Sequence, residues 1–178
     1  PQGHGMAVDA NGFVYIGQDT VRKYDPQTGG LVAEVARTPE REGGAPVGLP
    51  PPVERIPGEG TLRHADVFLP SRPGDPSALA ARAAAAAAFR EAYPPETPMI
   101  VGGLEEIRII DADNEMYVAD NYLGGRVLVF DLETFEFKRG WGAYGKPLEE
   151  ISTDDANHAY TPGGPMPRDF AGHLTLNI

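Results

Sequence analysis

Two histidines and one glutamate are the residues whose types and spacing could build a metal site. His4 and His173 each precede a short apolar segment, and Glu106 follows His4 at an offset of 102 residues. The same offset relates two longer stretches of the chain, so these residues occupy matching places in a repeat. Two imidazoles and a carboxylate are a competent zinc set that leaves one coordination position open for water or substrate. The sequence therefore predicts a metal site at His4, Glu106 and His173.

A second interpretation of these three residues involves no metal. A polar side chain at the start of a strand can hydrogen-bond the backbone there or face solvent. On this interpretation the residues serve their strands, and no chemistry follows from their matching positions.

A cluster of oxygen ligands occurs at Asp111, Asp113, Asn114 and Glu115, which makes calcium a second possible metal beside zinc. The cluster lacks the glycine and the distal glutamate of a calcium loop, so a hairpin turn is the favoured interpretation.

Three arginines are candidate ligands for an anionic substrate: Arg22, Arg108 and Arg126. Ion pairs with Asp25, Asp111 or Asp131 would account for them equally well, since guanidinium and carboxylate groups form strong hydrogen bonds.

A repeat positions these residues. The stretch 4–35 matches the stretch 106–141, first at an offset of 102 and then, after four extra residues in the second copy, at an offset of 106. The matched pairs are Asp9 with Asp111, Tyr15 with Tyr117, Ile16 with Val118, Tyr24 with Phe130, Asp25 with Asp131 and Thr28 with Thr134. Each copy places alternating apolar residues between turns rich in Asp, Asn and Gly, which is typical of antiparallel hairpins. We therefore expect four short antiparallel strands in each copy.

Repeated units of four antiparallel strands are typical of β-propeller blades, although an ordinary β-meander is an alternative. The predicted fold is all-β, a partial propeller with about two blades, the start of a third and one alanine-rich helical insertion. The predicted segments are a first blade (1–35), an insertion (36–103), a second blade (104–147), an inter-blade loop (148–171) and the start of a third blade (172–178). Because inner strands line a propeller's channel, the three candidate metal ligands would converge near its axis.

The insertion has two parts. Its first half is dense in proline and glycine and is expected to be an exposed, irregular loop. The second half contains ten alanines in the fifteen residues 78–92, preceded by Asp75-Pro76 and followed by Pro94-Pro95. A capping aspartate, a proline in the first turn and many alanines predict a helix. This helix would either cover one mouth of the channel or lie on the surface without a role.

The sequences PQGHGMAVDANGFVYI and NEMYVADNYLGGRVLVFD resemble NHL repeats. The resemblance implies a six-bladed NHL-type β-propeller, similar to bacterial NHL-repeat proteins and more distantly to peptide-amidating lyases, which carry histidines in the channel. It covers about half of the chain, and it departs from the usual pattern at Gly17-Gln18, where Ala-Asp is usual. On this resemblance alone, export to the periplasm or the outside of the cell is favoured over the cytoplasm.

Composition excludes several functions. The 15 basic and 26 acidic residues give a net charge of −11, which opposes binding to nucleic acid or anionic membranes. No apolar run approaches the length of a membrane span, and the absence of cysteine excludes disulfides and thiolate sites. No G-x-S-x-G, P-loop, dinucleotide or H-E-x-x-H motif occurs, which argues against covalent hydrolase chemistry.

Two functions remain after these exclusions. The first is a binding or scaffold module that presents its channel or loops to a protein or small-molecule partner, and that also contacts the remaining blades of its own propeller. The second is a metal-dependent propeller enzyme, a lyase or lactonase-like hydrolase, with its metal at His4, Glu106 and His173. The sequence favours the first, because it contains no complete catalytic set.

Overall fold

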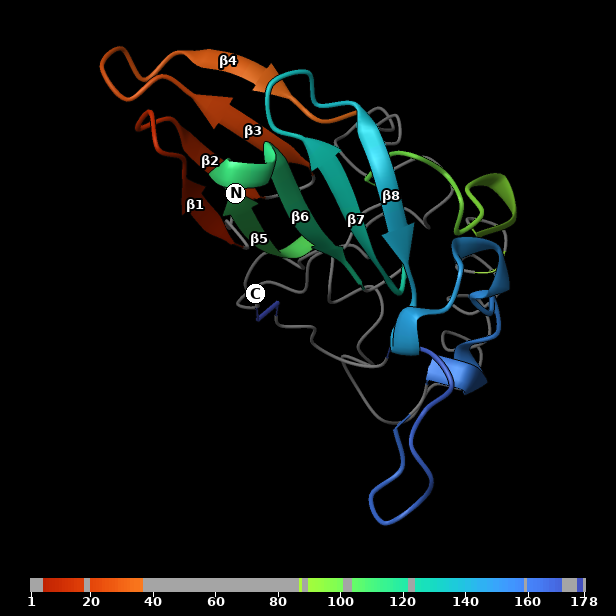
Figure 1. Ribbon diagram of the computed structural model, residues 1–178. Helices are drawn as coiled ribbons and strands as arrows, with labels where there is room; N and C mark the ends of the chain where they lie inside the picture. The colour runs from red at the N-terminus through yellow and green to blue at the C-terminus, as the bar shows by residue number, and fades with distance from the viewer. Residues whose placement is uncertain are drawn as a thin grey trace, which may run out of the picture.

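The short alternating segments of the repeat form two four-stranded antiparallel sheets in the structure, a computed structural model (Figure 1). The first sheet has the order β1 (Met6–Val8), β2 (Val14–Gly17), β3 (Val21–Tyr24) and β4 (Leu31–Glu34). The second has the order β5 (Leu104–Ile110), β6 (Glu115–Asp120), β7 (Arg126–Asp131) and β8 (Phe137–Trp141). The predicted pattern of four antiparallel strands in each copy is therefore confirmed.

The structure describes residues 5–17, 20–36, 87, 90–100, 104–121, 124–158, 160–170 and 176–177. Within this part of the chain the protein is mostly β, with four short 3-10 turns: η2 (Asp111–Asp113), η3 (Ala143–Gly145), η4 (Leu148–Glu150) and η5 (Asp155–His158). Ala87 and residues 90–92 are α-helical, whereas the rest of the predicted helix and the irregular loop before it lie outside the described residues. No helix among the described residues is long and apolar enough to cross a membrane.

The last turn of each sheet shows the repeat in atomic detail. The Asp25 carboxylate accepts hydrogen bonds from the backbone of Gln27 at 2.8 Å and Thr28 at 2.9 Å. Asp131, its partner at offset 106, accepts the corresponding bonds from Glu133 at 3.0 Å and Thr134 at 2.9 Å. Because the carboxylate is the form that accepts these bonds, they lower the pKa of both aspartates.

The first turns differ by one residue, and this changes the register. Val8 pairs with Val14, whereas Ile110 pairs with Glu115, so the second sheet has the shorter connection. Its 3-10 turn η2 is followed by Asn114, whose backbone is left-handed with φ 54°. In consequence Ile107 faces Val118 just as Met6 faces Ile16, although the sequence offset would match Met6 to Arg108.

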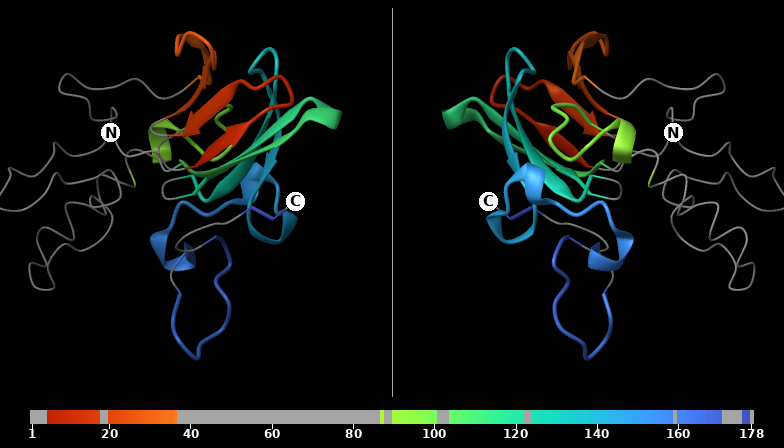
Figure 2. Two further views of the ribbon diagram at one scale, coloured as in Figure 1. Left: turned by 90° about the vertical axis from the view of Figure 1, so that its left-hand side faces the viewer. Right: turned by 90° about the vertical axis from the view of Figure 1, so that its right-hand side faces the viewer.

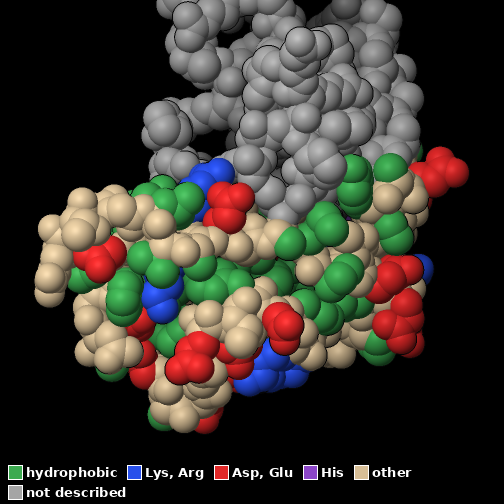
Figure 3. Space-filling view, turned by 90° about the horizontal axis from the view of Figure 1, so that it is seen from above, with side chains coloured by type: hydrophobic (Ala, Val, Ile, Leu, Met, Phe, Trp, Pro, Cys, Tyr) green, Lys and Arg blue, Asp and Glu red, His purple; other side chains and the backbone are tan. Residues whose placement is uncertain are grey.

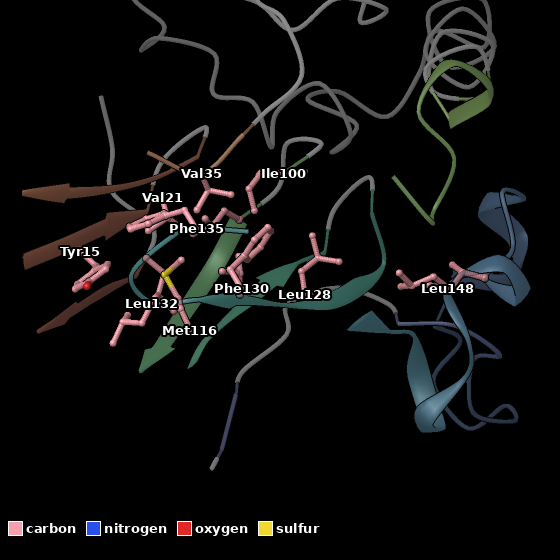
Figure 4. Packing of buried hydrophobic residues seen from close by; sticks show 14 residues of the cluster. Tyr15, Val21, Val35, Ile100, Met116, Leu128, Phe130, Leu132, Phe135 and Leu148 are labelled. Carbon is pink, nitrogen blue, oxygen red and sulfur yellow. The ribbon is translucent and has the colours of Figure 1, made fainter. Parts of the chain in front are cut away.

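One hydrophobic core fills the space between the two sheets and continues to Leu148 in the segment after β8 (Figure 4). β1 and β2 contact β5, and the Tyr15 ring of the first sheet stacks on Phe135 of the second with centroids 6.2 Å apart. The cluster comprises Tyr15, Val21, Val35, Ile100, Leu104, Ile107, Met116, Val118, Leu128, Phe130, Leu132, Phe135, Leu148 and Ile151. Burial of these side chains is the main force that holds one sheet on the other.

A buried arginine fixes the segment that leads into the second sheet. Arg126 is fully buried, bonds Asp120 Oδ2 at 2.9 Å and donates to the carbonyls of Pro95, Thr97 and Met99. Nearby, the Ile100 backbone donates to the carbonyl of Ala36 at 3.0 Å. The chain therefore leaves the first sheet and returns to the second at one place, whatever the length of the insertion between them.

Candidate functional site

Of the three predicted metal ligands, only Glu106 belongs to the described residues. His4 and His173 lie outside them, so the predicted site keeps the standing of a prediction. Glu106 is half-buried on β5, where its Oε1 pairs with Arg108 and its Oε2 accepts a hydrogen bond from the Leu176 backbone at 2.5 Å. This carboxylate is thus already partnered by the protein itself.

The register shift also changes which residue corresponds to Glu106. Glu106 pairs with Ala119, while Gly5 accepts a hydrogen bond from Gly17, the residue that matches Ala119 at offset 102. Glu106 therefore corresponds to Gly5, whereas the constant offset of 102 had matched it to His4. The two backbones lie close together, since a Cβ at Gly5 would be 3.1 Å from the Glu106 Cα.

The possible calcium cluster forms the hairpin turn that the sequence favours. Asp111 Oδ1 accepts a hydrogen bond from the Ala10 backbone at 2.8 Å, and Asn114 donates to Asp131 at 2.9 Å. Glu115 is paired with Lys138 and Arg139. No group of three or more His, Asp or Glu side chains in the described part of the chain is arranged to hold a metal ion.

The three arginines form ion pairs, but not with the predicted aspartates. Arg22 pairs with Glu34 across β3 and β4, Arg108 with Glu106 along β5, and Arg126 with Asp120. Strand register places Arg22 opposite Glu34 and Arg126 opposite Asp120, and the sequence does not display register directly. Arg108 and Glu106 lie two residues apart on the same side of β5. On the face shown in the space-filling view, basic side chains lie beside acidic ones at several places (Figure 3).

One ionic cluster lies on the face of the second sheet that points away from the first. Arg139 donates to both oxygens of Glu115, at 2.6 and 2.7 Å, and the Tyr117 hydroxyl donates to Glu115 at 2.9 Å. Arg139, followed by Lys138, lowers the pKa of Glu115, whereas partial burial raises the pKa of Tyr117. These groups hold one another and the neighbouring strands.

A loop after β8 projects away from both sheets, which the sequence pattern does not predict. Residues 160–170, the projecting loop, extend beyond the rest of the described chain in every ribbon view (Figures 1 and 2). Tyr160 and Met166 on this loop are 63% and 72% exposed, and nearby Tyr144 is 75% exposed. The Tyr144 hydroxyl donates to the Pro167 carbonyl at 3.0 Å, which places Tyr144 beside the part of the loop that carries Met166.

The base of the projecting loop is held by two polar side chains, His158 and Asp169. The His158 ring lies between two carbonyl oxygens, with Nδ1 2.9 Å from Phe170 and Nε2 2.8 Å from Ser152. Asp169 is buried and pairs with Lys146 at 2.5 Å. Both ends of the loop are thereby tied to the segment that follows β8, so the exposed side chains stand on a fixed base.

The His158 ring also lies close to the second sheet. A Cβ at Gly125, in the turn between β6 and β7, would lie 2.8 Å from His158 Cε1. From the sequence, 148–171 was expected to be an inter-blade loop. The signal that could have revealed more is a histidine followed by aromatic and methionine residues within a Pro/Gly-rich segment.

Comparison with protein-family models, curated proteins and solved structures found no match to this chain. The candidate site therefore stands on its own geometry. It combines exposed aromatic and thioether side chains with a buried polar anchor, an arrangement suited to contact with another molecule.

Proposed function

We propose that this chain is part of an NHL-type β-propeller and acts as a binding or scaffold module for a protein or small-molecule partner. The contact surface is the projecting loop together with Tyr144. The observation that carries the proposal is that Tyr160 and Met166 are exposed on a loop whose base is held by His158 and Asp169.

The anchor matters because ordering a loop costs free energy on binding. Each side chain or loop segment immobilised on association lowers the affinity, and a loop fixed in advance avoids part of that cost. Tyrosine and methionine are enriched in interfaces, and methionine adapts to partners of different shape. A fixed loop with such side chains can therefore bind a partner with a smaller free-energy cost of ordering.

The buried charged groups support a non-catalytic role. Asp9 accepts a hydrogen bond from Tyr15 at 2.9 Å, Arg126 and Asp169 are engaged as described above, and Arg90 lies 3.4 Å from the Thr153 carbonyl. Each of these groups is used to hold elements of the fold together.

A displayed library of random peptides tests the proposal, with the purified chain as bait. We expect enriched peptides to bind the chain with micromolar Kd and to lose about ten-fold or more in affinity for a Tyr160→Ser/Met166→Ser variant, since removing interface anchors costs this much. Val32→Ser, an exposed apolar residue on β4, serves as the control and should bind normally. Equal binding to the loop variant, or no enrichment at all, would contradict a protein-binding loop.

A second candidate is a metal-dependent propeller enzyme, a lyase or lactonase-like hydrolase. What favours it is the neighbourhood of Glu106, whose backbone lies against Gly5 and whose carboxylate bonds the Leu176 backbone. Gly5 follows His4 directly, and Leu176 is the third residue after His173. The pairing of Glu106 with Arg108 opposes it, because a neutralised carboxylate is a weaker metal ligand.

Metal analysis of the purified protein by mass spectrometry distinguishes the two candidates. The enzyme proposal requires stoichiometric zinc or another transition metal that is lost in a His4→Ala/His173→Ala variant and retained in His158→Ala. Metal-free protein, or metal retained by the double variant, rejects the enzyme and leaves the binding module in place.

A further inference from the structure

The tip of the projecting loop is a turn built from proline and glycine. The Gly164 backbone donates a hydrogen bond to the Thr161 carbonyl at 2.9 Å, and Gly163 has a φ of 76°. These are the features of a type II turn, with Pro162 at the first central position, which favours proline, and glycine at the second, which needs a positive φ. The chain therefore reverses at a defined point, beyond both sheets (Figures 1 and 2).

The three residues after the turn are restricted to an extended backbone. A proline holds its own φ at about −65° and disfavours helical angles in the residue before it, so Pro165 and Pro167 together restrict Met166. These angles are those of the polyproline II helix, which has about 3 residues per turn. The segment lies in neither helix nor strand, and Met166 is 72% exposed. Pro165-Met166-Pro167 is thus suited to present one turn of polyproline II helix to a partner.

The backbone of this segment is held at one end only. The carbonyls of Pro167 and Arg168 accept hydrogen bonds from side chains of the segment after β8, each at 3.0 Å. Among the described residues, none donates a hydrogen bond to the carbonyl of Pro165 or Met166. Two carbonyls are therefore available to a partner, and the fixed end reduces the free-energy cost of ordering the segment on binding.

The charge of the loop differs from that of the whole chain. Residues 156–168 contain no Asp or Glu, although the chain has 26 acidic residues and a net charge of −11. Arg168 is exposed directly after the proline segment. The carboxylate of the next residue, Asp169, is buried and paired with Lys146. An acidic partner surface is thus attracted to this tip, while the remainder of the chain repels it and so orients the approach.

The shape of the loop decides which side of the contact it supplies. A segment that projects from the molecule enters a hollow surface of its partner and does not form one itself. Grooves that take polyproline II segments are lined by aromatic side chains, against which the proline rings pack, and they exploit the low conformational entropy of the segment. Proline, methionine and one cation at the tip match such a groove if an acidic side chain lies at its edge.

We propose that Pro165–Arg168 is a ligand for a protein with an aromatic-lined groove that takes polyproline II segments and has an acidic side chain for Arg168. This inference rests on the proposed function, because it names the kind of partner that the projecting loop binds.

A displayed library of SH3 domains with randomised groove residues tests the inference, with the purified chain as bait. Enriched domains should keep aromatic residues in the groove and carry Asp or Glu beside it. Pro165→Ala/Pro167→Ala should weaken their binding by about ten-fold or more, because it removes both rings and the restriction on the backbone. The variant keeps the Pro167 carbonyl that Tyr144 bonds. Pro26→Ala, at an exposed proline in the last turn of the first sheet, is the matched control and should bind normally.

Two further measurements read the charge and the helix separately. Arg168→Glu should weaken binding by about ten-fold or more, and Arg168→Lys should retain most of it. A short polyproline peptide should displace the wild-type chain from an enriched domain, whereas a glycine-serine peptide of equal length should not. The competition uses the wild-type chain alone, so it decides the matter even where a variant proves less stable.

The outcomes separate this inference from the proposed function. Enriched domains without aromatic grooves, binding that survives Pro165→Ala/Pro167→Ala, or binding that resists the polyproline peptide would overturn the inference. If such binding is still lost in Tyr160→Ser/Met166→Ser, the proposed binding loop stands while its polyproline role fails. The absence of any enriched domain would also overturn the inference, and the random-peptide selection then decides the proposed function independently.

Discussion

At the scale of single residues, Arg126 is the buried side chain that joins the second sheet to the segment before it. It joins β7 to β6 through Asp120 and holds the carbonyls of Pro95, Thr97 and Met99. Arg126→Met removes the charge but keeps much of the volume, so the buried Asp120 carboxylate and the three carbonyls lose the hydrogen bonds that Arg126 donates. We expect a loss of about 3–5 kcal/mol in the free energy of unfolding, measured by urea denaturation.

A second variant checks that the cost comes from the stranded charge. Asp120→Leu combined with Arg126→Met removes both charges, and it should cost less than the sum of the two single substitutions, because an apolar pair can replace a buried ion pair. Additive losses would show that the pair acts only through its packing.

Ionisation of the Tyr15 hydroxyl makes the free energy of unfolding depend on pH in the alkaline range. Burial, followed by its hydrogen bond to Asp9, raises the pKa of the Tyr15 hydroxyl, so the folded state favours the neutral phenol. The resulting stability is present below the unfolded-state value near 10 and is lost as pH rises above it. Tyr15→Phe should cost about 1–3 kcal/mol at neutral pH, and the gap to wild type should narrow above about pH 10. Urea midpoints at both pH values measure this, with exposed Tyr160→Phe expected to leave the pH dependence unaltered.

At the scale of elements, the strands were predictable and their register was not. Alternation around Tyr15 and Tyr117 reports local structure, and the aspartates at 25 and 131 mark turns through bonds to residues close in sequence. The pairing of Ile110 with Glu115 depends on a turn one residue shorter than its counterpart, which near-identical Asp/Asn motifs do not reveal. That one residue is why Glu106 corresponds to Gly5 rather than to the position that a constant offset indicates.

The candidate site was the harder part to predict for a related reason. The anchor of the projecting loop joins residues that are separated in sequence, such as His158 with Phe170 and Lys146 with Asp169, and no spacing motif accompanies such contacts. The exposure of Tyr160 and Met166 likewise depends on the path of the whole loop, and that path is set by contacts between residues distant in sequence.

Gly125 tests whether the second sheet supports the projecting loop. Its φ of 60° is left-handed, and an added Cβ would collide with the His158 ring. Gly125→Ala should therefore cost about 1–3 kcal/mol and displace His158 from its two carbonyl partners. Relative to wild type, backbone hydrogen exchange in the variant should be faster in 152–170 and unchanged in β2 and β3. Gly145→Ala has a similar φ of 74° but nothing within 4 Å of the new Cβ, so it should strain the backbone without loosening the loop.

At the scale of the whole molecule, a net charge of −11 coexists with carboxylates that the fold needs in their ionised form. Backbone hydrogen bonds lower the pKa of Asp25 and Asp131, and Arg139 with Lys138 lowers that of Glu115. One of these groups lies in the first sheet and two in the second, so protonation weakens both halves of the structure at once. Acid therefore acts on the molecule through its turns and its ionic cluster, although it also relieves the general repulsion among negative charges.

The direction of the acid effect follows from these lowered pKa values. The folded state binds fewer protons than the unfolded chain, so stability is present above the ordinary carboxyl values near 4 and is lost as pH falls through the folded-state values. Urea midpoints should be nearly constant from about pH 7 to pH 5 and should fall steadily below about pH 4. In an Asp25→Asn/Asp131→Asn variant this fall should be shallower, because two of the linked groups no longer titrate. Glu149→Gln, on an exposed side chain of η4, is the control. An unchanged acid fall in the double variant would mean that relief of repulsion and the Glu115 cluster, rather than the two turns, govern how this molecule responds to acid.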